Sequence, residues 1–254
     1  MKHNIRSVIA VIIIIVVALF LIIQYSHWSY VYQSKENMPL SKACDTVLEI
    51  LANHEEKQKV PKDLFVYNVD EILDEIVKTS PDGSYDDLLW SFKRFEFCSV
   101  DSSFYAEIQF NESRSKFTSV DSSLSKLIED SNILAADPKE ERIKKICNYL
   151  KDNYKYDDTL ESDTISEMLG NGKYTCKSIS LLAFKVFRKT GIKCRLIAGT
   201  YLDEPHAWVQ VYVNNVWKNL DLTIWIENNE FYLVRSSEMP NHKIDNRYKS
   251  RFID

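Results

Sequence analysis

The sequence lacks an excess of positive charge and has no block of like charge. Lysine and arginine together number 32 against 37 acidic residues, which gives a formal net charge of −5. A nucleic acid partner is therefore not expected, because phosphate recognition demands a basic surface. The 254 residues are 45% apolar, so the chain is not of the disordered class and can build one large domain, or one domain with an extension.

Patterns typical of metal binding are also missing. The cysteines form no CxxC pair and have no neighbouring histidine cluster, which argues against zinc, and no calcium loop is recognisable. We therefore expect no metal and no cofactor. Because the cysteines number 5, two disulfides would leave one free thiol, and the sequence does not give the pairing. The cysteines are Cys44, Cys98, Cys147, Cys176 and Cys194.

An unbroken apolar run extends from Val8 to Ile23, with Lys2 and Arg6 before it and aromatic residues after it. This pattern predicts a single-pass transmembrane anchor, over residues 1–33 with its aromatic flank, whose N-terminus is cytoplasmic. A cleaved signal peptide would end in small residues, whereas this run exits through bulky ones. Cleavage, which would give a secreted soluble enzyme, and a buried helix remain the alternatives. The rest of the chain is then expected outside the cell membrane.

Residues 34–130 carry no chemical motif and are expected to form a helical stem with a small β-hairpin extension. The apolar spacing from Cys44 to Leu51 is helical, whereas Phe104 to Phe110 alternates as in a half-buried strand. The predicted elements are helices near residues 44–51, 70–78 and 84–95, strands at 102–110 and 116–120, and a helix at 124–128.

Two longer helices, with a short one from Thr164 to Leu169 between them, are predicted in the part that follows, residues 131–254. The first begins near Pro138 and has Cys147 on its apolar stripe, which indicates a core thiol. In the second, apolar residues at helical spacing run from Ile179 to Phe187 and place Cys176 in the first turn. The positive end of a helix favours thiolate over thiol, and its free N–H groups can receive an oxyanion.

Three strands are expected after this helix, at residues 193–198, 207–213 and 216–221. Asn214-Asn215 is a two-residue hairpin signal between the last two. This turn places position 206 opposite position 223, so Asp221 becomes the diagonal neighbour of His206. We therefore predict Cys176 as nucleophile, His206 as base and then acid, and Asp221 as the group that orients the imidazole.

The chain resembles the transglutaminase-like superfamily of papain-type thiol enzymes over about residues 134–248. The resemblance lies in glycines before Cys176, then a helix, Gly-Ile, a strand, His206-Ala-Trp, a strand and Asp221-Leu-Thr. It implies an α+β fold whose catalytic helix packs on an antiparallel sheet. It also implies a Cys176–His206–Asp221 triad that acts on a protein or peptide substrate through a thioester. Relatives commonly place Gly or Val directly before the cysteine, where this chain has Lys173-Tyr174-Thr175. Tyr174 is a candidate second oxyanion donor.

The resemblance leaves hydrolysis and amine transfer both open, so a peptidase, a deamidase and a cross-linking acyl transferase all fit. A non-catalytic surface binding or scaffold module that retains the fold is the alternative from another class. Oligomeric state has no signal in the sequence. The basic tail from Lys243 to Arg251 is expected to be a solvated terminus, with contact to an anionic surface as the alternative.

Overall fold

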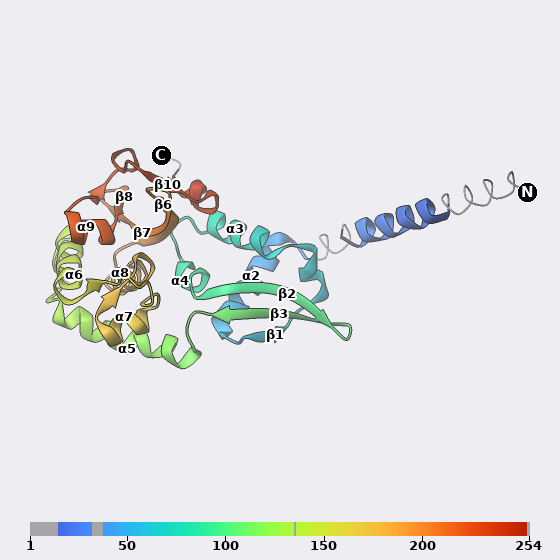
Figure 1. The fold of residues 1–254 in the computed structure, drawn as a ribbon, viewed down its shortest axis with the longest axis horizontal. Coiled ribbons are helices and arrows are strands. Elements are labelled where there is room, and N and C mark those ends of the chain that lie inside the picture. Colours follow the sequence, from blue (N-terminus) through green and yellow to red (C-terminus); the bar gives the residue numbers. More distant parts are fainter. Residues whose placement is uncertain (1–14, 32–37, 135, 253–254) are drawn as a thin grey trace, which may run out of the picture.

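The computed structural model describes residues 15–31, 38–134 and 136–252 (Figure 1). Residues 15–31 form a helix that extends away from a globular body. The body contains a three-stranded sheet on the N-terminal side and a five-stranded sheet on the C-terminal side, each with its own helices and hydrophobic core. This mixed α/β architecture with an antiparallel main sheet agrees with the predicted fold class.

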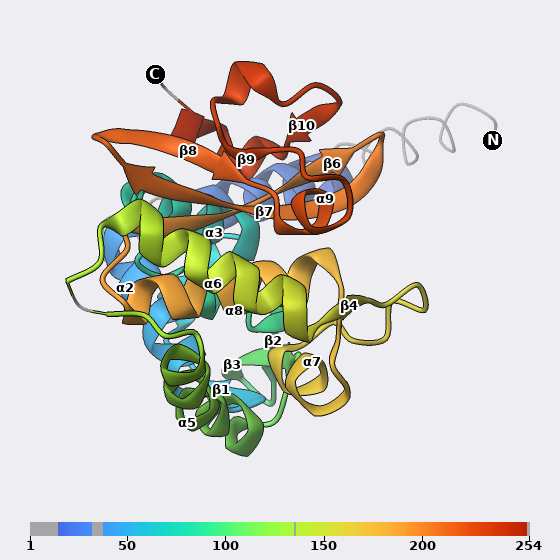
Figure 2. The same cartoon turned by 90° about the vertical axis from the view of Figure 1, so that its left-hand side faces the viewer.

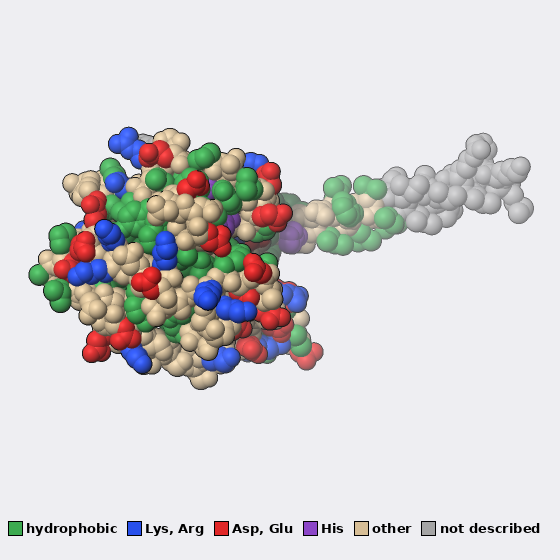
Figure 3. Space-filling model, turned by 60° about the vertical axis from the view of Figure 1, so that its left-hand side comes forward, with side chains coloured by type: hydrophobic (Ala, Val, Ile, Leu, Met, Phe, Trp, Pro, Cys, Tyr) green, Lys and Arg blue, Asp and Glu red, His purple; other side chains and the backbone are tan. Residues whose placement is uncertain are grey.

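The predicted transmembrane helix over Val8–Ile23 lies partly outside the described residues, which begin at 15. In the described part, the large apolar side chains from Ile15 to Ile23 are each more than half exposed, and they stand clear of the body (Figure 3). Within residues 15–31, 38–134 and 136–252, no helix is both long enough and apolar enough to cross a membrane. The anchor therefore stays a prediction.

The N-terminal core lies between two helices and a sheet. Helices α2 (Leu40–Asn53) and α3 (Val69–Thr79) bury their apolar stripes against it, as their spacing predicts. Strands β1 (Lys57–Lys59), β2 (Phe92–Val100) and β3 (Ser103–Phe110) form an antiparallel sheet in the order β1-β3-β2. A short 3₁₀ helix, η1 (Lys62–Val66), follows β1.

Two predicted elements in this region are wrong. The helix expected over residues 84–95 is limited to α4 (Asp86–Leu89), and the chain is a strand from Phe92, where Phe92, Phe95 and Phe97 pack edge to face. Aromatic residues favour such a pleated, half-buried surface. The strand expected at 116–120 is instead part of helix α5 (Arg114–Asp130), whose buried residues Val120, Leu124 and Leu127 form a helical stripe on the C-terminal core.

The C-terminal sheet has the order β10-β6-β7-β8-β9 and all its strand pairs are antiparallel. Helices α6 and α8 lie beneath it in Figure 2. Ser180 of α8 donates a hydrogen bond to the Ala207 carbonyl of β7 at 3.2 Å. The strands are β6 (Cys194–Tyr201), β7 (Glu204–Val213), β8 (Val216–Leu220), β9 (Tyr232–Val234) and β10 (His242–Ile244).

The remaining elements surround this sheet. They are α6 (Lys139–Asn153), α7 (Ile165–Asn171), α8 (Cys176–Lys189), α9 (Leu222–Asn228), the parallel pair β4 (Lys155–Tyr156) and β5 (Lys173–Tyr174), and the 3₁₀ helices η2 (Ser236–Glu238) and η3 (Asn246–Phe252).

The β7–β8 hairpin has the predicted register. Asn214 and Asn215 adopt φ values of 52° and 63°, and Val209 pairs with Leu220, a register whose continuation places 206 opposite 223. The connection before it is shorter than the gap between the strands predicted at residues 193–198 and 207–213. Strands β6 and β7 are joined by a turn at Leu202-Asp203, with φ values of 50° and 68°. His206 therefore lies inside β7 and not at its start.

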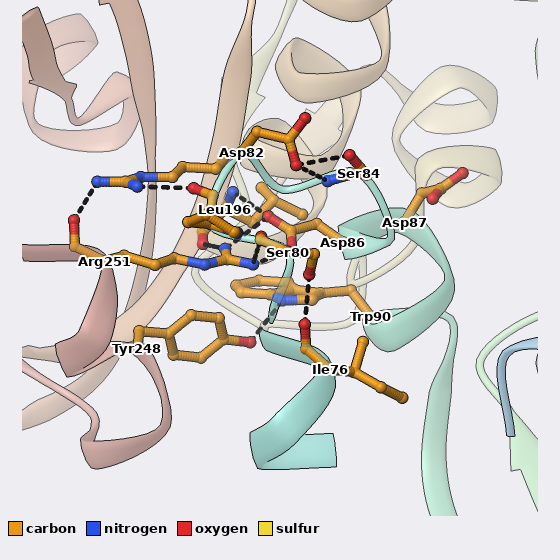
Figure 4. A network of polar contacts seen from close by, with 12 residues as sticks. Ile76, Ser80, Asp82, Ser84, Asp86, Asp87, Trp90, Leu196, Tyr248 and Arg251 are labelled. Atoms are coloured by element: carbon orange, nitrogen blue, oxygen red, sulfur yellow. Dashed lines mark hydrogen bonds and ion pairs between the residues drawn. The ribbon is translucent and has the colours of Figure 1, made fainter. Parts of the chain in front are cut away.

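The prediction of a solvated C-terminal tail is wrong for Arg251, whose side chain is fully buried. Its guanidinium donates to both oxygens of Asp86, Nη2 to Oδ1 at 2.6 Å and Nη1 to Oδ2 at 2.8 Å (Figure 4). Asp86 also accepts from the backbone N–H of Leu196 in β6 at 2.7 Å. This bidentate pair joins the N-terminal region, the main sheet and the tail, since a buried charge demands such partners.

Candidate active site

Cys176 is the first residue of α8, and its position is fixed by the cap of that helix. The Thr175 hydroxyl accepts from the Ser178 N–H at 3.3 Å, and the Ser178 hydroxyl accepts from the Thr175 N–H at 2.9 Å. This reciprocal capping box ends the preceding strand and starts the helix. The Cys176 thiol is free and half-buried, at the positive end of the α8 dipole, as predicted.

His206 and Asp221 are brought together by the β7–β8 hairpin. His206 Nε2 lies 2.7 Å from Asp221 Oδ2, and the two side chains are 8% and 0% exposed. Asp221 follows β8 directly and caps α9, because its Oδ1 accepts from the Ile224 N–H at 3.2 Å. The carboxylate therefore has one oxygen on a helix N-terminus and the other on the imidazole, which fixes its orientation.

The electrostatics of this pair favour an imidazolium next to a carboxylate. Burial lowers the pKa of His206, but the hydrogen bond to Asp221, followed by one to the Cys176 thiol, outweighs burial and raises that pKa to about 9. Burial would raise the pKa of the Asp221 carboxyl, yet hydrogen bonds from His206 and then His242 hold it below its ordinary value. His206 thus contacts Asp221 directly, and the Cys176 thiol is near enough to raise its pKa.

His242 is a member of this cluster that the sequence did not predict. Its Nε2 lies 3.0 Å from the same Asp221 Oδ2, and its side chain is 2% exposed. It comes from β10, which pairs with β6 so that His242 is opposite Tyr201. Nothing in the local sequence marks this histidine, because the strand that carries it reaches the site only through long-range pairing.

The other cysteines are placed differently from Cys176. Burial raises the pKa of Cys44 to about 11 and also raises the pKa values of Cys147 and Cys194. Cys147 lies on the buried stripe of α6, as predicted. The pKa of Cys98 is raised by desolvation and by Glu107. These four groups are held as thiols, which are poor nucleophiles.

Two imidazoles and a carboxylate, from His206, His242 and Asp221, are the donor set among the described residues that could hold a metal ion, with ligand atoms within 4.8 Å of one another. Such donors suit a transition metal. The 2.7 Å and 3.0 Å contacts to Asp221 are, however, hydrogen-bond distances. The three side chains therefore satisfy one another by direct hydrogen bonds in this structure.

Tyr174, the candidate oxyanion donor, is fully buried and its hydroxyl has no hydrogen-bond partner among the described residues. Its ring contacts Tyr156 edge to face at 5.6 Å. Burial and then the nearby Cys176 raise the pKa of Tyr156, which pairs with Tyr174 across β4 and β5. Two phenols thus lie near the N-terminus of α8, one of them with an unused donor.

Comparisons with known proteins find one family and several solved structures that are similar to this chain. Residues 130–222 match the transglutaminase-like superfamily. Three solved structures are similar to this chain. One is a TGase, with 16% sequence identity and a TM-score of 0.42. The others are a candidate cysteine protease from Cytophaga hutchinsonii, with 12% identity and a TM-score of 0.36, and a candidate protease from Parabacteroides distasonis, with 11% identity and a TM-score of 0.30.

The matches cover 58%, 60% and 50% of this chain and 49%, 70% and 35% of those structures, so the chain spans about half the length of the TGase. No curated protein is detectably similar. The match over residues 130–222 includes Cys176, His206 and Asp221. The predicted resemblance is thereby confirmed: residues 130–222 match the transglutaminase-like superfamily.

Proposed function

We propose that this chain is a thiol enzyme that acts on amide or peptide bonds through Cys176, His206 and Asp221. The observation that carries the proposal is the 2.7 Å contact of His206 with Asp221, together with the influence of the Cys176 thiol on the pKa of His206. A thiol, an imidazole and a carboxylate in this order form the relay needed for acyl transfer.

The reaction begins with the Cys176 thiolate, which is paired with the His206 imidazolium. The sulfur attacks the carbonyl carbon of a carboxamide or peptide, and the carbonyl π electrons move onto oxygen. Backbone N–H groups at the start of α8 are placed to receive this oxyanion. His206 then donates its proton to the departing nitrogen, the C–N bond breaks, and a thioester to Cys176 remains.

A second nucleophile resolves the thioester. His206, now neutral, accepts a proton from water or from an amine as that group attacks the carbonyl carbon, and the thiolate leaves. Water gives hydrolysis, as in a peptidase or deamidase, whereas an amine gives a cross-link. Throughout, Asp221 holds the imidazole and balances its charge.

The proposal is tested by labelling with an acyl-directed thiol probe, such as a peptidyl vinyl ketone, followed by mass spectrometry. We expect labelling at Cys176 that is lost in His206→Ala. Cys147 and Cys194 serve as controls within the same chain, because both are fully buried. Equal labelling of all cysteines, insensitive to His206, would reject the enzyme and favour a binding or scaffold module.

The enzyme is proposed to be held at the cell membrane by residues 8–23, with its N-terminus cytoplasmic and residues 34–254 outside. Support comes from the apolar run after Lys2 and Arg6, and from the exposed apolar side chains of the helix at 15–31. We expect the full-length protein to resist carbonate extraction and to be accessible to protease added outside intact cells. Release by carbonate, or a mature chain that begins after residue 23, would contradict this.

A further inference from the structure

The carboxylate of Asp221 is shared between two histidines, and the proposed relay uses only one of them. His206 Nε2 and His242 Nε2 contact the same oxygen, Oδ2, at 2.7 Å and 3.0 Å. We propose that His242 is a positioning residue, which keeps Asp221 ionised and oriented toward His206. The inference rests on the proposed function, since it assigns a role within the same site.

Three contacts leave the carboxylate of Asp221 little freedom. Oδ1 accepts from the Ile224 N–H at the start of α9, and Oδ2 accepts from both imidazoles. A carboxylate oxygen only accepts, so the contact with His242 is a hydrogen bond donated by its Nε2. Without it, the fully buried Oδ2 would keep a single donor, and burial would favour the protonated form of Asp221.

The imidazole of His242 is itself held tightly by aromatic rings. Its ring centroid lies 4.7 Å from that of Tyr201, 5.3 Å from that of Trp208 and 5.0 Å from that of Phe231, the last two edge to face. Its Nδ1 lies 3.2 Å from the Pro240 carbonyl oxygen. Because the ring is enclosed on several sides, it cannot turn away from Asp221 without displacing its neighbours.

The strand that carries His242 depends on a glycine in β6. A Cβ on Gly199 would lie 2.1 Å from the Lys243 carbonyl oxygen of β10 and 3.0 Å from the Trp208 ring. Any side chain at this position must therefore push β10 away from β6. Gly199→Ala would move His242 without changing any member of the hydrogen-bonded cluster.

The test compares His242→Phe, which keeps a ring but has no donor, with His242→Gln, whose amide can donate near the place of Nε2. The readout is the rate of Cys176 alkylation by iodoacetamide as a function of pH, measured on the full chain by mass spectrometry. The titratable groups that face the cluster are His206, Tyr201, Tyr174 and Cys176, and they are unchanged in every variant.

We expect His242→Phe to move the acid limb of the Cys176 alkylation profile, the pH range over which the rate rises, up by about one pH unit. A hydrogen bond to a charged group corresponds to about this shift. His242→Gln should restore most of the profile, and Gly199→Ala should shift it in the same direction as Phe. Folding is monitored by circular dichroism. If His242→Phe does not fold, His242→Asn, which is too short to reach Asp221, replaces it with the same expectation.

An unchanged acid limb in a folded His242→Phe protein would overturn the inference, as would an equal shift in His242→Gln. Alkylation needs no amide substrate, so the two proposals fail separately. A shifted limb in a protein without amide turnover rejects the proposed function only. Turnover with an unshifted limb rejects the role of His242 only.

Discussion

Replacing Asp221 with asparagine removes the negative charge beside His206 and keeps the shape of the side chain. The pKa of His206 is about 9 against an ordinary value of 6.5. That difference corresponds to about 3 kcal/mol in favour of the imidazolium, and the hydrogen bond to Asp221 is its largest favourable cause. Because burial opposes the charged ring, we expect the His206 pKa in Asp221→Asn to fall to 6.5 or below.

The consequence for Cys176 follows from this shift. At pH 7.5, almost every His206 ring in the unmodified protein carries a proton, whereas about one ring in ten would do so at a pKa of 6.5. The thiolate is stabilised by the imidazolium, so alkylation of Cys176 at this pH should slow by about tenfold.

The assay measures iodoacetamide incorporation at Cys176 by peptide mass spectrometry across the pH range. A matched control is Asp157→Asn, which removes another buried carboxylate, 2% exposed, whose oxygens accept hydrogen bonds from the Ser162 and Thr159 hydroxyls. This control should leave the profile unchanged. Equal rates in Asp221→Asn and the unmodified protein at pH 7.5 would refute the coupling of the three groups.

The pKa of His206 is raised in the folded state, so its stabilising contribution is fully present below pH 6.5 and is lost as pH rises through about 9. The free energy of unfolding, from urea titrations, should therefore fall by up to about 3 kcal/mol over that window, and His206→Gln should remove the fall. The same pH dependence of the free energy of unfolding in His206→Gln and in the unmodified protein would contradict this. Asp86→Asn should cost about 3–5 kcal/mol, because Arg251 is left buried and uncompensated. Asp74→Asn, at an exposed ion pair, should cost at most about 1 kcal/mol of stability. Equal losses of stability in Asp74→Asn and Asp86→Asn would disprove this difference between the exposed and the buried pair. Cys147, fully buried in α6, should be alkylated only as fast as the protein unfolds, and rapid labelling under native conditions would count against its assignment to the core.

Features encoded by local patterns could be predicted from the sequence. The stripe from Ile179 to Phe187 defines α8 and the place of Cys176, because a helix with one buried face repeats every 3.6 residues. The Asn214-Asn215 turn fixes the register that brings Asp221 to His206, since turn length sets strand pairing.

Features that depend on long-range pairing could not be predicted. Arg251 and Asp86 are 165 residues apart in sequence, and neither shows a local sign of burial. His242 reaches Asp221 only because β10 pairs with the edge of β6. The mistaken extension of the 84–95 helix past Phe92 has a similar cause, since aromatic residues that suit a helix face also suit a sheet, and tertiary packing decides between them.

The most direct test of the central claim is detection of the acyl-enzyme. The protein is incubated with a peptide library rich in carboxamide side chains, quenched in acid and analysed by mass spectrometry. We predict an acyl adduct on the peptide that contains Cys176, removable by hydroxylamine, absent in Cys176→Ala and strongly reduced in His206→Ala. A library that returns unchanged, with no adduct on Cys176 at any pH between 6 and about 9, would contradict acyl transfer by this site.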